Sequence, residues 1–105
     1  MTTCTEFSVF KVPQENIERV IALSNKIFSE MNADEQVILS SQVLQRTDNN
    51  TELCWHLTWK NQTVAKETTA KWPSFPSTKE FQSLVGENVY YGHFINAAVI
   101  NENLQ

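Results

Sequence analysis

The segment "LCWHLTW" (residues 53–59) decides the fold, because it is typical of a β-strand that is covered on both sides. Successive side chains of a strand point to opposite faces of the sheet. One face of this segment carries only leucine and tryptophan: Leu53, Trp55, Leu57 and Trp59. The other face carries Cys54, His56 and Thr58. Since neither face is cleanly polar, we expect a central strand with other groups packed above and below it.

The segments on either side of this strand complete a β-α-β-β-α-β order. Apolar residues recur at helical spacing within 15–31, and "TDNNT" (47–51) has the turn chemistry that joins two strands in a hairpin. The expected strands cover 5–12, 36–46, 52–59 and 88–100, and the expected helices lie within 15–31, 60–72 and 77–85. This order predicts an α+β, ferredoxin-like fold with a four-stranded antiparallel sheet.

Proline and a capping motif mark the ends of the last two helices. "PSFP" (73–76) ends the helix over 60–72, because proline cannot continue the hydrogen-bond ladder. "STKE" (77–80) predicts a capping box, in which Ser77 and Glu80 satisfy free backbone N–H groups at the start of the next helix. Gly86 is expected to stop that helix.

Composition limits the class of protein. The chain of 105 residues is expected to form one domain over 1–105. The net charge is −4, and the eight Lys and Arg residues are scattered, so we expect no nucleic-acid partner. No secretory signal and no apolar run of membrane-spanning length is visible, which favours a cytoplasmic protein without a membrane partner. Cys4 and Cys54 are expected to be free thiols.

The other strands repeat the two-sided apolar pattern. In the strand over 88–100, Val89, Tyr91 and His93 share one face, and Tyr90 and Phe94 share the opposite face. A sheet with helices on one side only is expected to be polar on its open side, whereas here both sides carry large apolar groups. A second copy of the chain is the simplest cover for the open side, so the pattern predicts a homodimer with sheets packed face to face.

These features together resemble a known family. The element order, the chain length, and a third strand that ends in Trp59 and runs into a helix ("LTWKNQTVAKETTAKW", 57–72) are similar to the antibiotic biosynthesis monooxygenase-like family of dimeric α+β barrels. The resemblance spans about residues 5–100 and implies a homodimer with an apolar cavity between sheet and helices. Some members oxidise phenolic or quinol substrates with O2 and no metal or flavin, others degrade haem, and many have no known activity.

The chain departs from the family at the positions that would carry chemistry. The histidine that often follows the strand-closing tryptophan by about nine residues falls near Thr68 here. Haem-degrading members use an Asn on the first strand, and this chain has no Asn there. They also use a Trp and a His on the second helix. Near those places this chain has Thr68 and Thr78, and its Trp72 is out of register. The departures argue against haem degradation.

The remaining candidates suit a small aromatic ligand. His93 and His56 are the candidate catalytic bases, because imidazole accepts protons near neutral pH, although each can instead be a structural histidine. The candidate substrate-binding residues are Trp55, Trp59, Trp72 and Tyr91, whose alternative role is core packing.

No cofactor and no metal is expected. Cys4, Cys54, His56 and His93 are the possible zinc ligands, but Cys-x-His on a strand lacks the spacing of zinc sites. The sequence thus leaves two functions open. One is a cofactor-independent monooxygenase acting on a small aromatic or quinol-type substrate, and the other is a non-catalytic homodimer that binds a small apolar or aromatic molecule.

Overall fold

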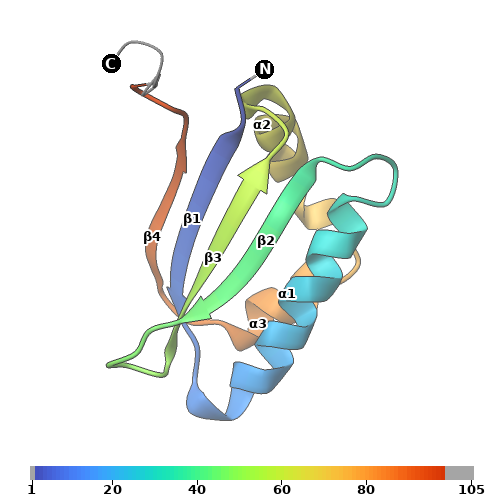
Figure 1. Cartoon of the computed structure of the whole chain (residues 1–105). Coiled ribbons are helices and arrows are strands. Elements are labelled where there is room, and N and C mark those ends of the chain that lie inside the picture. Colours follow the sequence, from blue (N-terminus) through green and yellow to red (C-terminus); the bar gives the residue numbers. More distant parts are fainter. Residues whose placement is uncertain (1, 99–105) are drawn as a thin grey trace.

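The computed structural model describes residues 2–98 and confirms the α+β, ferredoxin-like fold (Figure 1). One antiparallel sheet has the strand order β2-β3-β1-β4, so β1 and β3 are central. The strands are β1 (Cys4–Lys11), β2 (Ile38–Gln45), β3 (Glu52–Trp59) and β4 (Asn88–Phe94). The helices are α1 (Ile17–Met31), α2 (Gln62–Ala70) and α3 (Thr78–Leu84), with short 3-10 turns at Gln14–Asn16 and Trp72–Ser74.

Most predicted elements are somewhat shorter in the structure, and two of them differ most. The helix predicted over 60–72 begins at Gln62, because the Asn61 side chain accepts a hydrogen bond from the Val64 backbone N–H, and it ends before Pro73. The strand predicted over 88–100 ends at Phe94, and its last two residues lie outside the described part of the chain.

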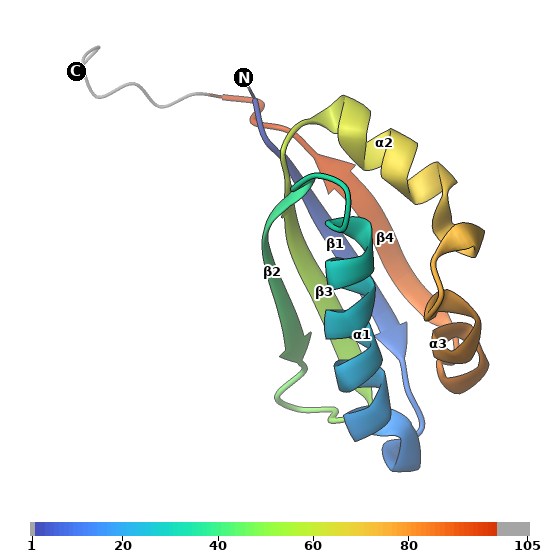
Figure 2. The same ribbon diagram turned by 90° about the vertical axis from the view of Figure 1, so that its right-hand side faces the viewer.

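The three helices cover one face of the sheet (Figure 2). The leucine and tryptophan face of β3 lies beneath them, and Leu57 at its centre is fully buried. Trp55 packs edge-on against Phe28 of α1 with ring centroids 4.7 Å apart. Its indole N–H donates to the Ser24 hydroxyl at 2.9 Å, so the one polar group of this buried ring is satisfied.

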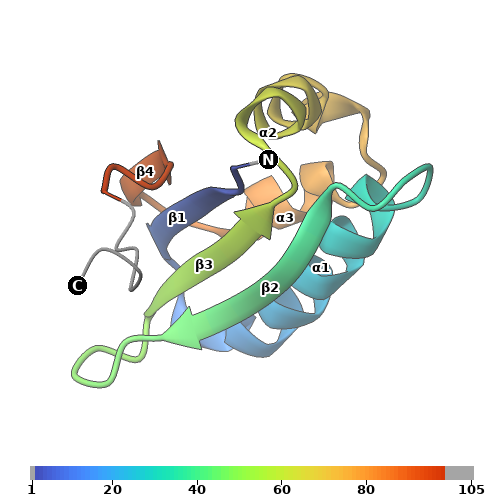
Figure 3. The same cartoon turned by 45° about the horizontal axis from the view of Figure 1, so that its top comes forward.

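The opposite face of the sheet carries no helix among the described residues (Figure 3). His56 lies at its centre, stacked on Phe7 with ring centroids 4.7 Å apart and with Nδ1 3.0 Å from Gln42 Oε1. Tyr90 and Phe94 lie on the same face and are each nearly half exposed. Charged side chains gather at the hairpin end, where Arg46 pairs with Asp48 and Glu52, and Lys60 pairs with Glu35 beyond the other end of β3. The apolar open face predicted from the sequence is therefore present.

A bulge corrects one predicted face of β4. Val9 of β1 pairs with Tyr90, but Phe10 pairs with Asn88, so Val89 is an extra residue in β4. The alternation predicted from the sequence placed Val89 on the same face as Tyr91. The extra residue shifts the register, and Asn88 takes that place beside the helix-covered face.

The predicted capping box is wrong. The Ser77 side chain makes no cap hydrogen bond; its hydroxyl and its backbone N–H donate to the two carboxylate oxygens of Glu30 on α1, at 2.5 and 3.1 Å. Glu80 instead accepts two hydrogen bonds of 2.8 Å from Arg19, also on α1. A carboxylate and a guanidinium are stronger partners than backbone groups, so these side chains tie α3 to α1. Gly86 has no positive φ, and its N–H donates to the Lys11 carbonyl at 2.7 Å.

We expect Ser77→Ala to lower the free energy of unfolding by about 1.5–3 kcal/mol, because it removes a hydrogen bond to the charged Glu30. The matched control is Ser83→Ala on the same helix, where the hydroxyl bonds only to the local Glu80 carbonyl, and its change stays within about 0.5 kcal/mol. Urea unfolding of both variants measures the difference. Equal losses would show that the bond to Glu30 contributes nothing.

Candidate functional site

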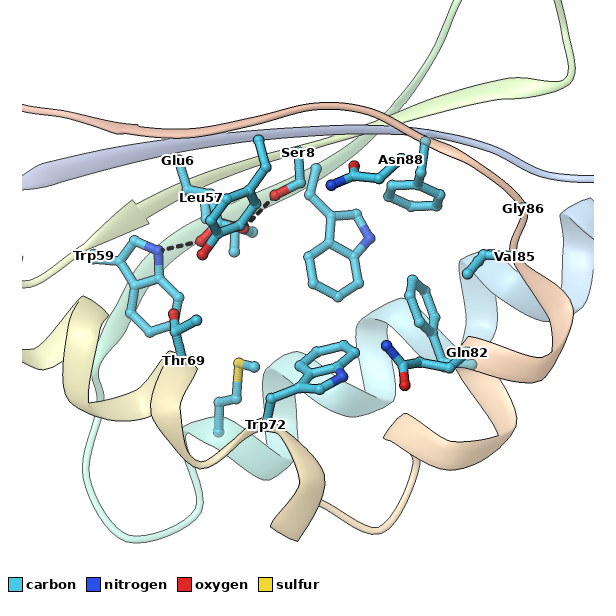
Figure 4. Close-up of a pocket in the computed structure, with 15 residues that line it drawn as sticks. Glu6, Ser8, Leu57, Trp59, Thr69, Trp72, Gln82, Val85, Gly86 and Asn88 are labelled. Atoms are coloured by element: carbon cyan, nitrogen blue, oxygen red, sulfur yellow. Dashed lines mark hydrogen bonds between the residues drawn. The ribbon is translucent and has the colours of Figure 1, made fainter.

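A cavity of about 300 Å³ lies between the sheet and the segment that runs from α2 to α3 (Figure 4). Its walls are mainly aromatic: Phe10, Trp55, Trp59, Trp72, Phe81 and Tyr91. The polar lining residues are Glu6, Ser8, Thr69, Gln82 and Asn88. The volume is at the lower end of the range of about 300–1,000 Å³ that is usual for small-molecule sites.

The structure brings most of the predicted site residues together. The four residues proposed from the sequence to bind substrate, Trp55, Trp59, Trp72 and Tyr91, all line this cavity. His93 lies next to the cavity wall, in contact with Tyr91. His56 lies on the opposite face of the sheet, so the two candidate catalytic histidines do not share a site. The roles of these residues stay predictions.

The residue that sequence reasoning missed is Glu6, which is 3% exposed. Its Oε1 accepts a hydrogen bond from Trp59 Nε1 at 3.0 Å and lies 2.9 Å from His93 Nε2, and its Oε2 accepts from Ser8 Oγ at 2.6 Å. The signal in the sequence was an acidic residue inside an otherwise apolar strand, "TEFSVFKV". Strand alternation puts Glu6 on the same face as Phe10, and therefore beneath the helices.

Strand pairing explains how these groups meet. Glu6 on β1 is directly opposite Leu57 on β3 and directly opposite His93 on β4. Neighbouring strands lie about 4.8 Å apart, so the carboxylate can reach donors on both sides. Trp59 donates to it from β3, and the His93 ring nitrogen lies within hydrogen-bond distance from β4.

His93 connects the carboxylate to the cavity. Its Nε2 lies 2.9 Å from Glu6 Oε1 and 3.0 Å from Tyr91 Oη, and the tautomer decides which contact it donates to. Burial raises the pKa of Tyr91, a hydrogen bond with Thr69 lowers it, and the nearby Glu6 charge raises it, with a net increase. Tyr91 therefore presents a neutral phenol to the cavity at physiological pH.

The candidate zinc ligands are dispersed. Cys4 is buried on the helix-covered face, whereas Cys54 and His56 belong to the open face. Burial raises the pKa of both thiols. Within residues 2–98, no three side chains of His, Cys, Asp or Glu are grouped so that they could hold a metal ion. No helix in the same part of the chain is both long enough and apolar enough to cross a membrane.

Several solved structures have a fold similar to that of this chain. The chain matches SnoaB, a cofactor-independent oxygenase from Streptomyces nogalater, with a TM-score of 0.67 and 13% identity over 95% of this chain and 96% of that chain. A candidate antibiotic biosynthesis monooxygenase from Chloroflexus aurantiacus J-10-fl matches with a TM-score of 0.67 and 13% identity, covering 94% and 97%. MupZ from Pseudomonas fluorescens matches with a TM-score of 0.70 and 15% identity, covering 89% and 71%.

These likenesses show the fold. The chain has the fold of the antibiotic biosynthesis monooxygenase-like proteins, as the sequence resemblance predicted. No family model and no curated protein matches the sequence.

An alkaline titration tests the environment of Tyr91. The pKa of Tyr91 is raised in the folded state, so folding favours the neutral phenol. The free energy of unfolding therefore includes a contribution that is present below about pH 10, and this contribution is lost as the pH rises through the folded-state pKa. We expect tyrosinate absorbance to contain a component that ionises above the usual range. Tyr91→Phe should remove this component, and Tyr90→Phe, on the other face of β4, should retain it. A late component that survives in Tyr91→Phe would contradict the placement.

Proposed function

We propose that this chain is a cofactor-independent monooxygenase that oxidises a small phenolic or quinol-type aromatic substrate. The observation that carries the proposal is the Tyr91 hydroxyl at the cavity wall, backed by His93 and by the buried carboxylate of Glu6. Tyr91 and His93 would remove the substrate's phenolic proton, and Trp55, Trp59 and Trp72 would bind its rings. Similarity of fold to a cofactor-independent oxygenase supports the same conclusion.

The proton would leave the substrate through Tyr91. When the His93 ring carries its proton on Nδ1, Nε2 accepts the proton of Tyr91 as Tyr91 accepts that of the substrate. The newly protonated Nε2 then donates to Glu6 Oε1, whose negative charge stabilises the imidazolium. Glu6 is a positioning residue in this scheme, because it acts on the substrate through His93.

The substrate itself supplies the electrons. A phenolate is electron-rich enough to reduce O2, and the protein contributes deprotonation and orientation. For a quinol, one O2 accepts four electrons from the ring: one oxygen atom becomes the new hydroxyl group of a hydroxyquinone, and the other leaves as water. The aromatic walls would hold the flat ring and exclude water from the reacting carbon.

Activity measurements can separate the candidate residues. General acid–base catalysis contributes about 10²–10⁴-fold, so we expect Tyr91→Phe and His93→Gln to lower kcat for quinol-dependent O2 uptake by about 100-fold. The matched control is Tyr90→Phe, one residue along β4 on the opposite face, which keeps its activity within about twofold. His56→Gln tests the other histidine: loss of turnover in this variant alone would assign the base to His56 and contradict the proposal.

The alternative function predicts a different pattern. A non-catalytic binding protein would show ligand-dependent quenching of tryptophan fluorescence and a raised melting temperature without O2 uptake. The mainly aromatic lining of the cavity is compatible with this outcome.

We also propose that the chain forms a homodimer through the open face of its sheet. The centre of this face presents Phe7, Tyr90 and Phe94, and the ion pairs of Arg46 lie at the hairpin end, so a second copy can meet the centre through aromatic groups. The contact would hold the outer face of β4, the strand that carries Tyr91 and His93 on its inner face.

We expect native mass spectrometry to give about twice the mass of the 12.1 kDa chain. Phe94→Glu should yield monomer, because it places an unpaired charge in the middle of the apolar contact. The control Gln82→Glu adds the same charge on α3 on the helix-covered side and should remain dimeric. A monomeric wild-type chain would exclude this interface.

A further inference from the structure

The charge of the cavity comes from one side chain. Glu6 is the one acidic residue among the lining residues, which include no Lys, Arg or His. The basic residues on the helices beside the cavity are exposed; Lys66 and Lys71 lie on or after α2, and Lys79 lies on α3. The negative charge of Glu6 therefore has no opposite charge in the cavity wall.

The hydrogen bonds of Glu6 leave its charge in place. Trp59 and Ser8 are neutral donors, and they orient dipoles toward the carboxylate without cancelling its charge. His93 would cancel the charge only when its ring is protonated, and in the proposed reaction it begins as the neutral base. In the proposed reaction, an incoming substrate therefore meets a cavity whose one acidic group, Glu6, has only neutral partners.

An anionic ligand would face two costs in this cavity. It would lose its hydration among aromatic walls, and it would approach a like charge with no cation to compensate. A neutral hydroxyarene faces neither cost, because its hydroxyl can donate to Tyr91 and its rings can pack on tryptophan. The expected difference in affinity between an anionic and a neutral hydroxyarene of similar size therefore comes from the charge of the ligand.

We propose that Glu6 makes the cavity select uncharged hydroxyarenes and reject those that carry an ionised carboxylate. This inference rests on the proposed function and specifies its substrate class. It also restricts the preceding step of a reaction sequence. If the carbon skeleton is built as a carboxylic acid, a decarboxylation or an esterification must come before this chain acts.

Three related ligands test the selection. The probes are 1,4-dihydroxynaphthalene, 1,4-dihydroxy-2-naphthoic acid and the methyl ester of that acid, with binding measured by tryptophan fluorescence under anaerobic conditions, so that no turnover is needed. We expect the ester to bind within about threefold of the parent quinol and the acid to bind at least about tenfold more weakly than the ester, because like charges brought together without compensation cost several kcal/mol. The ester is the control for size.

Two variants assign the effect to Glu6. Glu6→Gln keeps the shape and removes the charge, and it should reduce the difference between acid and ester to about threefold or less. Glu67→Gln makes the same charge change on α2 at an exposed position outside the cavity lining, and it should leave the difference intact because solvent screens that site.

Each outcome decides the proposal. Equal binding of acid and ester to the wild-type chain overturns the proposal. If both bind more weakly than the parent quinol, the proposal is also overturned, because the cavity would then exclude ligands by their size and not by their charge. If the difference in affinity between acid and ester persists in Glu6→Gln, the proposal is also overturned, because another group would then discriminate against the acid. If this variant does not fold, the comparison of acid and ester on the wild-type chain still tests the proposal. If none of the three ligands binds, the proposed function fails together with the inference. Binding with the expected difference but without O2 uptake would remove the oxygenase activity and leave the selection.

Discussion

A carboxylate buried inside a β-sheet must be satisfied by its neighbours, and this requirement at Glu6 organises the site. Removing an ionised group from water costs several kcal/mol unless hydrogen bonds replace the lost hydration. Glu6 meets the requirement with Trp59 from β3, His93 from β4 and Ser8 from its own strand. Because Trp59 and His93 come from the two flanking strands, the arrangement is possible only where β1 lies between β3 and β4. The ferredoxin-like strand order provides this position.

Local patterns were sufficient to predict most of the fold from the sequence. The alternation in "LCWHLTW" predicted a central strand, and its leucine and tryptophan face is the centre of the core; the cover predicted for the other face stays a prediction. The structure places Trp55, Trp59, Trp72 and Tyr91, the residues predicted to bind substrate, in the lining of the cavity, and their role stays a prediction. Short-range periodicity is a property of the chain itself, so it can be read before any contact is known.

The errors concern contacts between residues far apart in the sequence. Glu6 contacts Trp59, 53 positions away, and His93, 87 positions away. Contacts over such separations cannot be recognised from a local sequence pattern. Ser77 had the spacing of a capping box, yet Glu30, 47 residues earlier, offers it a stronger acceptor. His56 and His93 could not be distinguished from each other, because their separation depends on which face of each strand lies beneath the helices. Function is determined at this long-range level, since one fold carries many activities and the site's own chemistry distinguishes them.

The extra residue Val89 in β4 has an evolutionary consequence. Because it shifts the register between Val9 and Phe10, the amide of Asn88, rather than an aliphatic side chain, stands at the edge of the cavity. Deletion or duplication of a single codon at this point would exchange the side chain that an incoming molecule meets, while Tyr91 and His93 kept their partners on β1. The position lies at the end of an edge strand, outside the buried core, where changes in chain length are tolerated. Descendants of one ancestral gene could therefore diverge in ligand preference through changes in length at this site, with the interior unaltered.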